Sequence, residues 1–115
     1  MPNQILNHKS KNNRKYDLIE RTAKIGENII EFSQSLSSTP INNPLISQIV
    51  RSGTSIGANY TEADCANSRK DFFYKIGLCK KEAKETMHWL RMFAKANPTK
   101  KTTAEKFIKK LMSLS

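Results

Sequence analysis

The sequence predicts an all-α fold, an antiparallel up-down-up-down four-helix bundle with a short fourth helix. Apolar residues recur at helical spacing in four segments of the 115-residue chain. The chain has only four Gly and four Pro, which argues against a turn-rich β fold. The breaks between segments are short, and short connections between long helices make neighbours antiparallel. We expect a flexible basic leader at 1–13, then one domain over 14–115 with helices near 14–37, 44–66, 69–96 and 102–114.

The first predicted helix carries an apolar arc that is too wide to face a single neighbouring helix. One strip of this arc consists of Leu18, Ile25, Ile29, Phe32 and Leu36. A second strip, about 100° around the helix, consists of Ile19, Ala23, Gly26 and Ile30. We therefore expect this helix to contact two other helices, or another subunit.

The second predicted helix begins near Pro44, which suits a first helical turn, with Asn43 as its cap. Its expected core line is Leu45, Ile49, Gly53, Ile56, Tyr60 and Ala63. Gly53 and Gly57 lie one turn apart, and small residues at this spacing let a neighbouring helix approach closely. The polar surroundings exclude a membrane dimerisation motif, so we interpret this spacing as ordinary packing.

Capping residues and a proline mark the ends of the last two predicted helices. Ser68 is the expected N-cap of the third helix, with Asp71 placed to complete a capping box. Asn97 followed by Pro98 ends that helix. Thr102 opens the fourth helix by the same capping chemistry, and we expect this helix to be shorter than its partners.

Placing the residues of the third helix about 100° apart divides it into three strips. The core strip consists of Phe72, Ile76, Cys79, Ala83, Met87, Leu90 and Ala94. The second strip, here called the basic ridge, consists of Lys70, Lys81, Lys84, His88, Arg91 and Lys95. The third strip holds Leu78, Trp89 and Phe93. An exposed patch of such residues usually marks an interface, so we expect these three to mediate self-association.

The formal net charge of +10 is concentrated in the leader and in the C-terminal half of the chain. Residues 1–15 carry a basic arm of Lys9, Lys11, Arg14 and Lys15, whereas residues 16–68 are net negative. A pI near 9.8 favours a nucleic acid or another polyanion as partner. The basic ridge contains basic residues and no acidic ones, and contacts to backbone phosphates require only spaced positive charges. A lysine stripe opposite a core is also typical of a solvated face, so both interpretations stay open at this point.

The sequence offers little for catalysis. Glu85 and His88 have the spacing of a di-iron bundle motif, but such sites need two copies and further inward carboxylates. Cys65 and Cys79 fit no zinc spacing and are interpreted as free, buried thiols of a reducing compartment. We expect no catalytic residue, no cofactor and no metal site.

A ladder of polar residues lines one side of the second predicted helix. It consists of Arg51, Ser55, Asn59 and Glu62. Ser55 and Asn59 allow close packing, and we expect Arg51 and Glu62 to pair with other helices or subunits. The ladder has no neighbouring base or metal group that would make it catalytic.

The segment IVRSGTSIGANYTEA at residues 49–63 resembles the signature of the four-helix-bundle family named for the 23S rRNA intervening sequence. The motifs SxxDF at 68–72 and KEAxETxxWL at 81–90 are similar to the third-helix motif of this family. The resemblance implies a homopentamer without catalysis, and it implies a structural role for Glu82 and for the polar ladder. The accessory variability determinant of diversity-generating retroelements, which binds nucleic acid and a reverse transcriptase, is similar to this family.

We therefore expect a non-enzymatic, oligomeric, cytoplasmic accessory protein that binds RNA or DNA through the basic ridge and the basic arm. The alternative is a protein–protein adaptor or scaffold ring that docks a larger protein. The apolar runs are too short to span a membrane, and the N-terminus does not resemble a signal peptide.

Overall fold

The structure, a computed structural model, describes the backbone of residues 2–114 and the side chains of residues 17–114. The described chain is all-α, as the sequence predicts. Its helices are α1 (Pro2–Gln34), α2 (Asn42–Asp64), α3 (Arg69–Ala96) and α4 (Lys101–Met112), with a 3₁₀ turn, η1 (Pro98–Lys100), before α4. The sequence predicts the first helix over about 14–37, but α1 begins at Pro2 and ends at Gln34, so the backbone of the predicted leader belongs to this helix from Pro2 on. The side chains of the basic arm lie outside this description. Within the described part, no helix is long and apolar enough to cross a membrane.

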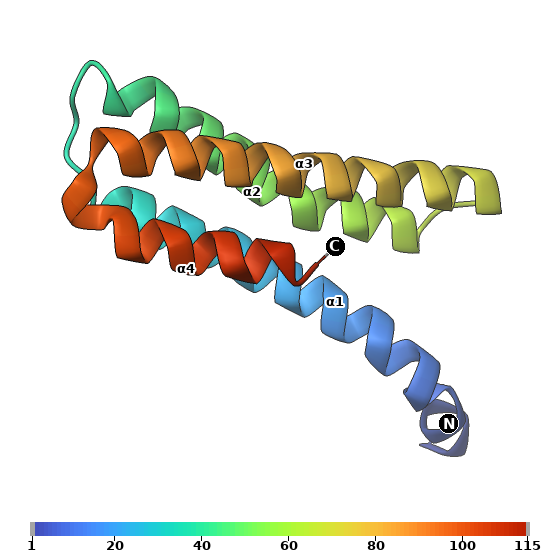
Figure 1. The fold of residues 1–115 in the computed structure, drawn as a ribbon. Coiled ribbons are helices and arrows are strands. Elements are labelled where there is room, and N and C mark those ends of the chain that lie inside the picture. The colour runs from blue at the N-terminus through green and yellow to red at the C-terminus, as the bar shows by residue number, and fades with distance from the viewer. Residues whose placement is uncertain (1, 115) are drawn as a thin grey trace.

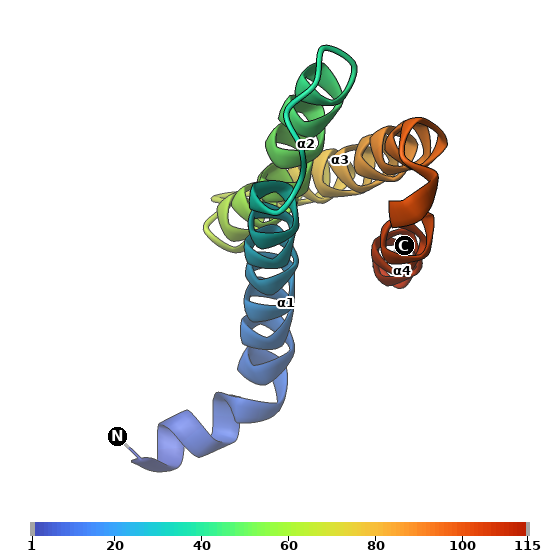
Figure 2. The ribbon, with the colours of Figure 1, turned by 90° about the vertical axis from the view of Figure 1, so that its left-hand side faces the viewer.

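The helices run up and down in chain order, and each packs against the next (Figures 1 and 2). Helix α4 has 12 residues and α3 has 28, so α4 runs back along less than half of α3. The fourth helix is therefore short, as predicted, and it covers only the end of the bundle near the α3–α4 connection (Figure 1).

The core takes at least one large apolar side chain from each of the four helices. Its fully or nearly fully buried members include Ile25, Ile29, Phe32, Ile49, Ile56, Leu90, Phe93 and Leu111. Phe32 of α1 links three helices, because its ring centroid lies 5.7 Å from that of Phe93 and 5.2 Å from that of Phe107. The predicted core lines of the first two helices are thus confirmed at their central positions.

Close approach of α1 and α2 depends on glycine at two positions. A Cβ at Gly53 would collide with Cδ1 of Ile29, and one at Gly57 would lie 3.3 Å from the backbone of Thr22. The small residues of α2 therefore do what their spacing predicts, and the neighbour that they admit is α1.

Helix α3 has the ends that the sequence predicts. The Asp71 N–H donates to Oγ of Ser68 at 3.0 Å, so Ser68 is the cap. At the other end, the Asn97 N–H donates to the Phe93 carbonyl at 2.9 Å, and Pro98 begins the 3₁₀ turn.

The predicted starts of α2 and α4 are wrong. Helix α2 begins at Asn42, not after an Asn43 cap. The Asn42 N–H donates to Oγ1 of Thr39 at 3.0 Å, and the Asn42 side chain is held from across the bundle. Its amide and that of Asn97 exchange hydrogen bonds of 3.0 and 2.8 Å. Helix α4 begins at Lys101 without a side-chain cap from Thr102, because η1 leads directly into it.

Candidate nucleic-acid interface

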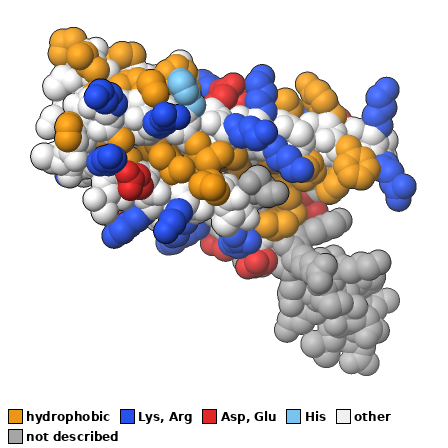
Figure 3. Space-filling model, in the orientation of Figure 1, with side chains coloured by type: hydrophobic (Ala, Val, Ile, Leu, Met, Phe, Trp, Pro, Cys, Tyr) orange, Lys and Arg blue, Asp and Glu red, His pale blue; other side chains and the backbone are white. Residues whose placement is uncertain are grey.

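The basic ridge lies on the outer side of α3. Its six members, Lys70, Lys81, Lys84, His88, Arg91 and Lys95, are all exposed. No ion pair within the described side chains involves any of them. Figure 3 shows Lys and Arg side chains along α3 and a further set along α4. The ridge is therefore an accessible row of basic side chains, most closely spaced from Lys81 to Lys95.

Two of the three carboxylates of α3, those of Glu82 and Glu85, are bound by a single arginine from α2. Arg51 donates from Nη1 to Glu82 at 3.3 Å and from Nη2 to Glu85 at 2.7 Å. Gln48 orients the guanidinium by accepting from its Nε at 2.9 Å. The hydrogen bond to Glu85 is the main reason that the pKa of Arg51 is raised. Arg51 thereby draws both acids toward α2 and away from the cations of the ridge.

The rest of the polar ladder also ties α2 to itself or to α3. Ser55 donates to the Arg51 carbonyl at 2.6 Å, and the Asn59 amide donates to the Ser55 carbonyl at 2.9 Å. Glu62 pairs with Lys75 of α3 at 3.0 Å, and this hydrogen bond raises the pKa of Lys75. The geometry gives these residues interhelical and backbone contacts.

A buried hydroxyl pair lies between the ladder and the core. Oγ1 of Thr86 lies 2.8 Å from Oγ of Ser52 and 2.7 Å from the Glu82 carbonyl. The Ser52 hydroxyl donates to the Gln48 carbonyl at 2.7 Å. The helical spacing of α3 does not predict this contact, because Thr86 falls between the core strip and the third strip.

The family model described as 23S rRNA-intervening sequence protein matches residues 14–115, almost the whole described chain. The chain belongs to this family. A crystal structure of a protein of unknown function from the S23 ribosomal protein family of Bacteroides thetaiotaomicron is similar, with a TM-score of 0.73 and 30% identity. That similarity covers 84% of this chain and 90% of the other. No curated protein gives a significant match.

In this member of the 23S rRNA-intervening sequence protein family, one of the three residues predicted to form an exposed self-association patch is not exposed. Phe93 is fully buried within the chain and packs edge-on against Phe32. Trp89 is partly buried against the core, and Leu78 is half-buried. Helix α3 packs on both α2 and α4, and α1 reaches it through Phe32, so more of its circumference is covered than one neighbour would require.

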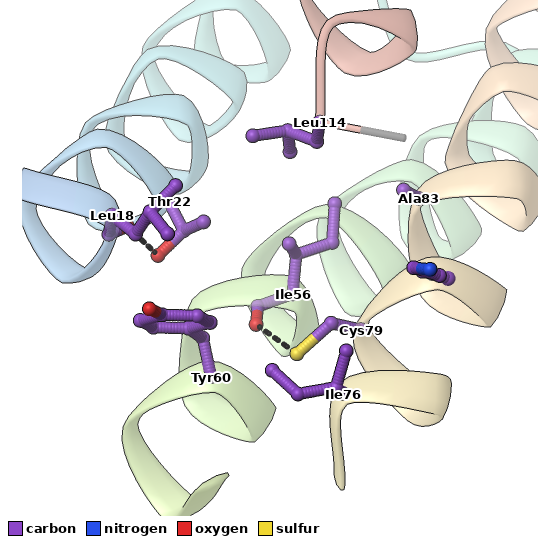
Figure 4. Close-up of a pocket in the computed structure, with 9 residues that line it drawn as sticks. Leu18, Thr22, Ile56, Tyr60, Ile76, Cys79, Ala83 and Leu114 are labelled. Carbon is purple, nitrogen blue, oxygen red and sulfur yellow. Dashed lines mark hydrogen bonds between the residues drawn. The ribbon is translucent and has the colours of Figure 1, made fainter. Parts of the chain in front are cut away.

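Two surface hollows flank α3. The larger, which we call the α3–α4 groove, has a volume of about 510 Å³ and includes ridge members Arg91 and Lys95 with Lys101 of α4. The smaller is an apolar pocket of about 170 Å³ beside the end of α4. Figure 4 shows Leu18, Tyr60, Cys79 and Leu114 around this pocket. Helical periodicity alone could not find either hollow, since both depend on where α4 lies.

Of the remaining predicted site features, Glu85, His88 and Cys65 line neither hollow. Glu85 binds Arg51, and His88 is exposed with its ring 5.0 Å from that of Trp89. Among the described side chains, no three metal-ligating residues converge. Cys79 is half-buried, but Cys65 is exposed, so the prediction of two buried thiols is wrong for Cys65.

Proposed function

We propose that this protein is a non-enzymatic accessory protein that binds nucleic acid through phosphate contacts from the basic ridge. The observation that carries this proposal is the row of six exposed basic side chains whose neighbouring carboxylates are bound by Arg51. From Lys70 to Lys95 the ridge extends about 37 Å at 1.5 Å per residue. This length matches about one turn of B-DNA, roughly 34 Å.

Helix α4 and the turn before it carry further positive charge outside the ridge. The exposed lysines there are Lys100, Lys101, Lys106, Lys109 and Lys110, against the single acid Glu105. We propose that the basic arm adds to the ridge and that self-association into a ring, a pentamer by family resemblance, multiplies the ridge. The family description refers to 23S rRNA, which favours RNA as the first ligand to test. We place this activity in the cytoplasm, where free thiols stay reduced.

The test is fluorescence-anisotropy binding to a structured RNA and to a DNA duplex across about 50–300 mM salt, where phosphate contacts give a steep salt dependence. The variant is Lys81→Gln/Lys84→Gln, and the matched control is Arg21→Gln/Lys24→Gln on α1, which changes the net charge equally. Each phosphate-binding lysine that is removed lowers the salt slope by about 1. For the ridge variant we expect the plot of log K against log salt concentration to become less steep by about two units. For the control we expect no change in this slope.

Two results would refute this proposal. Equal losses in the ridge variant and its control would show that net charge, not the ridge, governs binding. Absence of binding to either nucleic acid at the lowest salt would show that the ridge is only a solvated face.

A protein–protein adaptor is the second candidate, and two exposed aromatic side chains favour it. Phe73 and Tyr74, near the start of α3, are each 62% exposed. Exposed aromatic residues are enriched in protein interfaces. A protein partner that stays bound after nuclease treatment, and is lost in Phe73→Ser/Tyr74→Ser, would support the adaptor over nucleic-acid binding.

A further inference from the structure

The α3–α4 groove differs from the rest of the basic ridge because it combines cations with an exposed apolar floor. Arg91 and Lys95 lie on its α3 side, and Lys101 lies on its α4 side. The floor between them is formed by Ala94, Pro98 and Ile108. Figure 3 shows hydrophobic side chains exposed between the basic rows of α3 and α4. A ligand that fills this groove must therefore present both negative charge and an apolar face.

The charge balance within the groove favours an anion. Glu105 is the only acid among the residues that line it, and it pairs with Lys101 at 3.9 Å. Both side chains of that pair are well exposed, at 66% and 59%, so the pair is weak and readily exchanged for another partner. Arg91 and Lys95 have no ion-pair partner among the described side chains, so the groove keeps a net positive charge.

We propose that the α3–α4 groove binds an unpaired nucleotide of a single-stranded segment, an inference that rests on the proposed nucleic-acid function. In a duplex the base faces are stacked on one another, so a duplex offers this groove phosphates but no apolar surface. An unpaired nucleotide offers both, and its base can stack on an arginine guanidinium such as that of Arg91. Arg91 and Lys95 also belong to the ridge, so a strand whose phosphates follow the ridge reaches the groove without a break.

Lys101 separates this inference from the proposed function, because it lines the groove but lies outside the ridge. The variant is Lys101→Gln, and the matched control is Lys100→Gln, an exposed neighbour that does not line the groove. A third variant, Ile108→Ser, removes part of the floor without changing the charge. Its thermal unfolding is measured alongside, because Ile108 also packs against the core. The lysine pair keeps the test decisive even if Ile108→Ser unfolds.

The probes are an unstructured oligouridine RNA and an RNA duplex with the same number of phosphates, compared by anisotropy at 0.1 M salt. On single strands, log K falls with log salt concentration by about 0.7 per phosphate contact, so the loss of one contact weakens binding about fivefold at this salt. We expect Lys101→Gln to show this fivefold loss for oligouridine and little change for the duplex. Lys100→Gln should change neither, and a folded Ile108→Ser should weaken oligouridine binding alone.

Three results would overturn the inference. If both RNAs bind equally well and Lys101→Gln behaves as Lys100→Gln does, the groove binds no nucleotide, while the proposed ridge function stands. If an acidic peptide competes at the groove and oligouridine does not, the occupant is a protein segment. If neither RNA binds at low salt, the proposed function fails together with this inference.

Discussion

The two ends of the bundle differ in how completely their apolar side chains are buried. In the end that α4 covers, which we call the closed half, Ile29, Leu90, Phe93 and Leu111 are fully buried. In the other end, the open half, several large side chains of the core lines are only partly buried. They include Leu18, Tyr60, Phe72 and Ile76. The same amphipathic helices thus make a complete core at one end and an incomplete core at the other.

The length of α4 accounts for this difference. Its 12 residues end before the open half begins, and Leu114 lies at the edge of the apolar pocket there (Figure 4). Burial of apolar surface is the main favourable term in folding, so stability should be concentrated in the closed half. Surface that the open half leaves exposed remains available to another chain or ligand.

The largest effect that tests this difference is expected from Phe93→Ala. Removing a fully buried Phe leaves a cavity and lowers the free energy of unfolding by about 3–5 kcal/mol. The matched change in the open half, Phe72→Ala, should cost less than about 2 kcal/mol, because full burial of such a side chain is worth about 1.5–3 kcal/mol. Urea denaturation followed by circular dichroism measures both. Equal losses would mean that the open half is covered in solution, as a ring of subunits would do.

A second substitution in the closed half tests its packing by adding an atom. In Gly53→Ala the new Cβ meets the fully buried side chain of Ile29. Overpacking of this kind costs about 1–3 kcal/mol, and the better helix propensity of Ala returns about 1 kcal/mol. We expect a net loss of up to about 2 kcal/mol in the same urea experiment. A net gain would show that α1 and α2 separate easily at this point.

The corresponding glycine in the open half should respond with the opposite sign. A Cβ at Gly77 meets no atom within 4 Å, and the residue lies exposed in the interior of α3. Gly77→Ala should therefore raise the free energy of unfolding by about 0.5–1 kcal/mol, through helix propensity alone. A loss of stability instead would indicate that this face of α3 contacts another subunit that the added methyl disturbs.

The features that the sequence predicts well are those set by local chemistry. Both ends of α3 follow from Ser68 and from Asn97 with Pro98, because caps and prolines act within one helical turn. The exposure of the basic ridge likewise follows from periodicity, since the apolar strip of a helix turns toward the core.

The features that the sequence does not predict depend on partners far away along the chain. Phe93 is buried because Phe32, some sixty residues earlier, packs on it. Asn42 and Asn97, 55 residues apart, exchange side-chain hydrogen bonds. In the candidate interface, Lys101 lines the groove only because η1 turns α4 back along α3. No spacing rule within one helix contains that information.

The two cysteines give the smallest expected effect, and they report on the open half without unfolding the protein. Burial raises the pKa of the Cys79 thiol, which lines the apolar pocket and donates to the Ile56 carbonyl at 3.5 Å. Cys65 is exposed. Because the thiolate is the nucleophile, iodoacetamide at pH 8 should alkylate Cys65 before Cys79, with Cys65→Ser and Cys79→Ser assigning the two rates by mass spectrometry.

The same thiol gives the open half a pH dependence of known sign. The unfolded thiol titrates near 9.0, and the folded pKa is higher, so the folded state holds this proton more tightly. The contribution of Cys79 to stability is therefore fully present below about pH 9 and is lost as the pH rises through the folded pKa. Cys79→Ser should remove this part of the loss of stability at alkaline pH, and Cys65→Ser should leave it in place.

The alkylation experiment has one contrary outcome. If Cys79 reacts with iodoacetamide as fast as Cys65, the pocket of the open half is open to solvent most of the time. The contrast between the two halves is then greater than the structure shows.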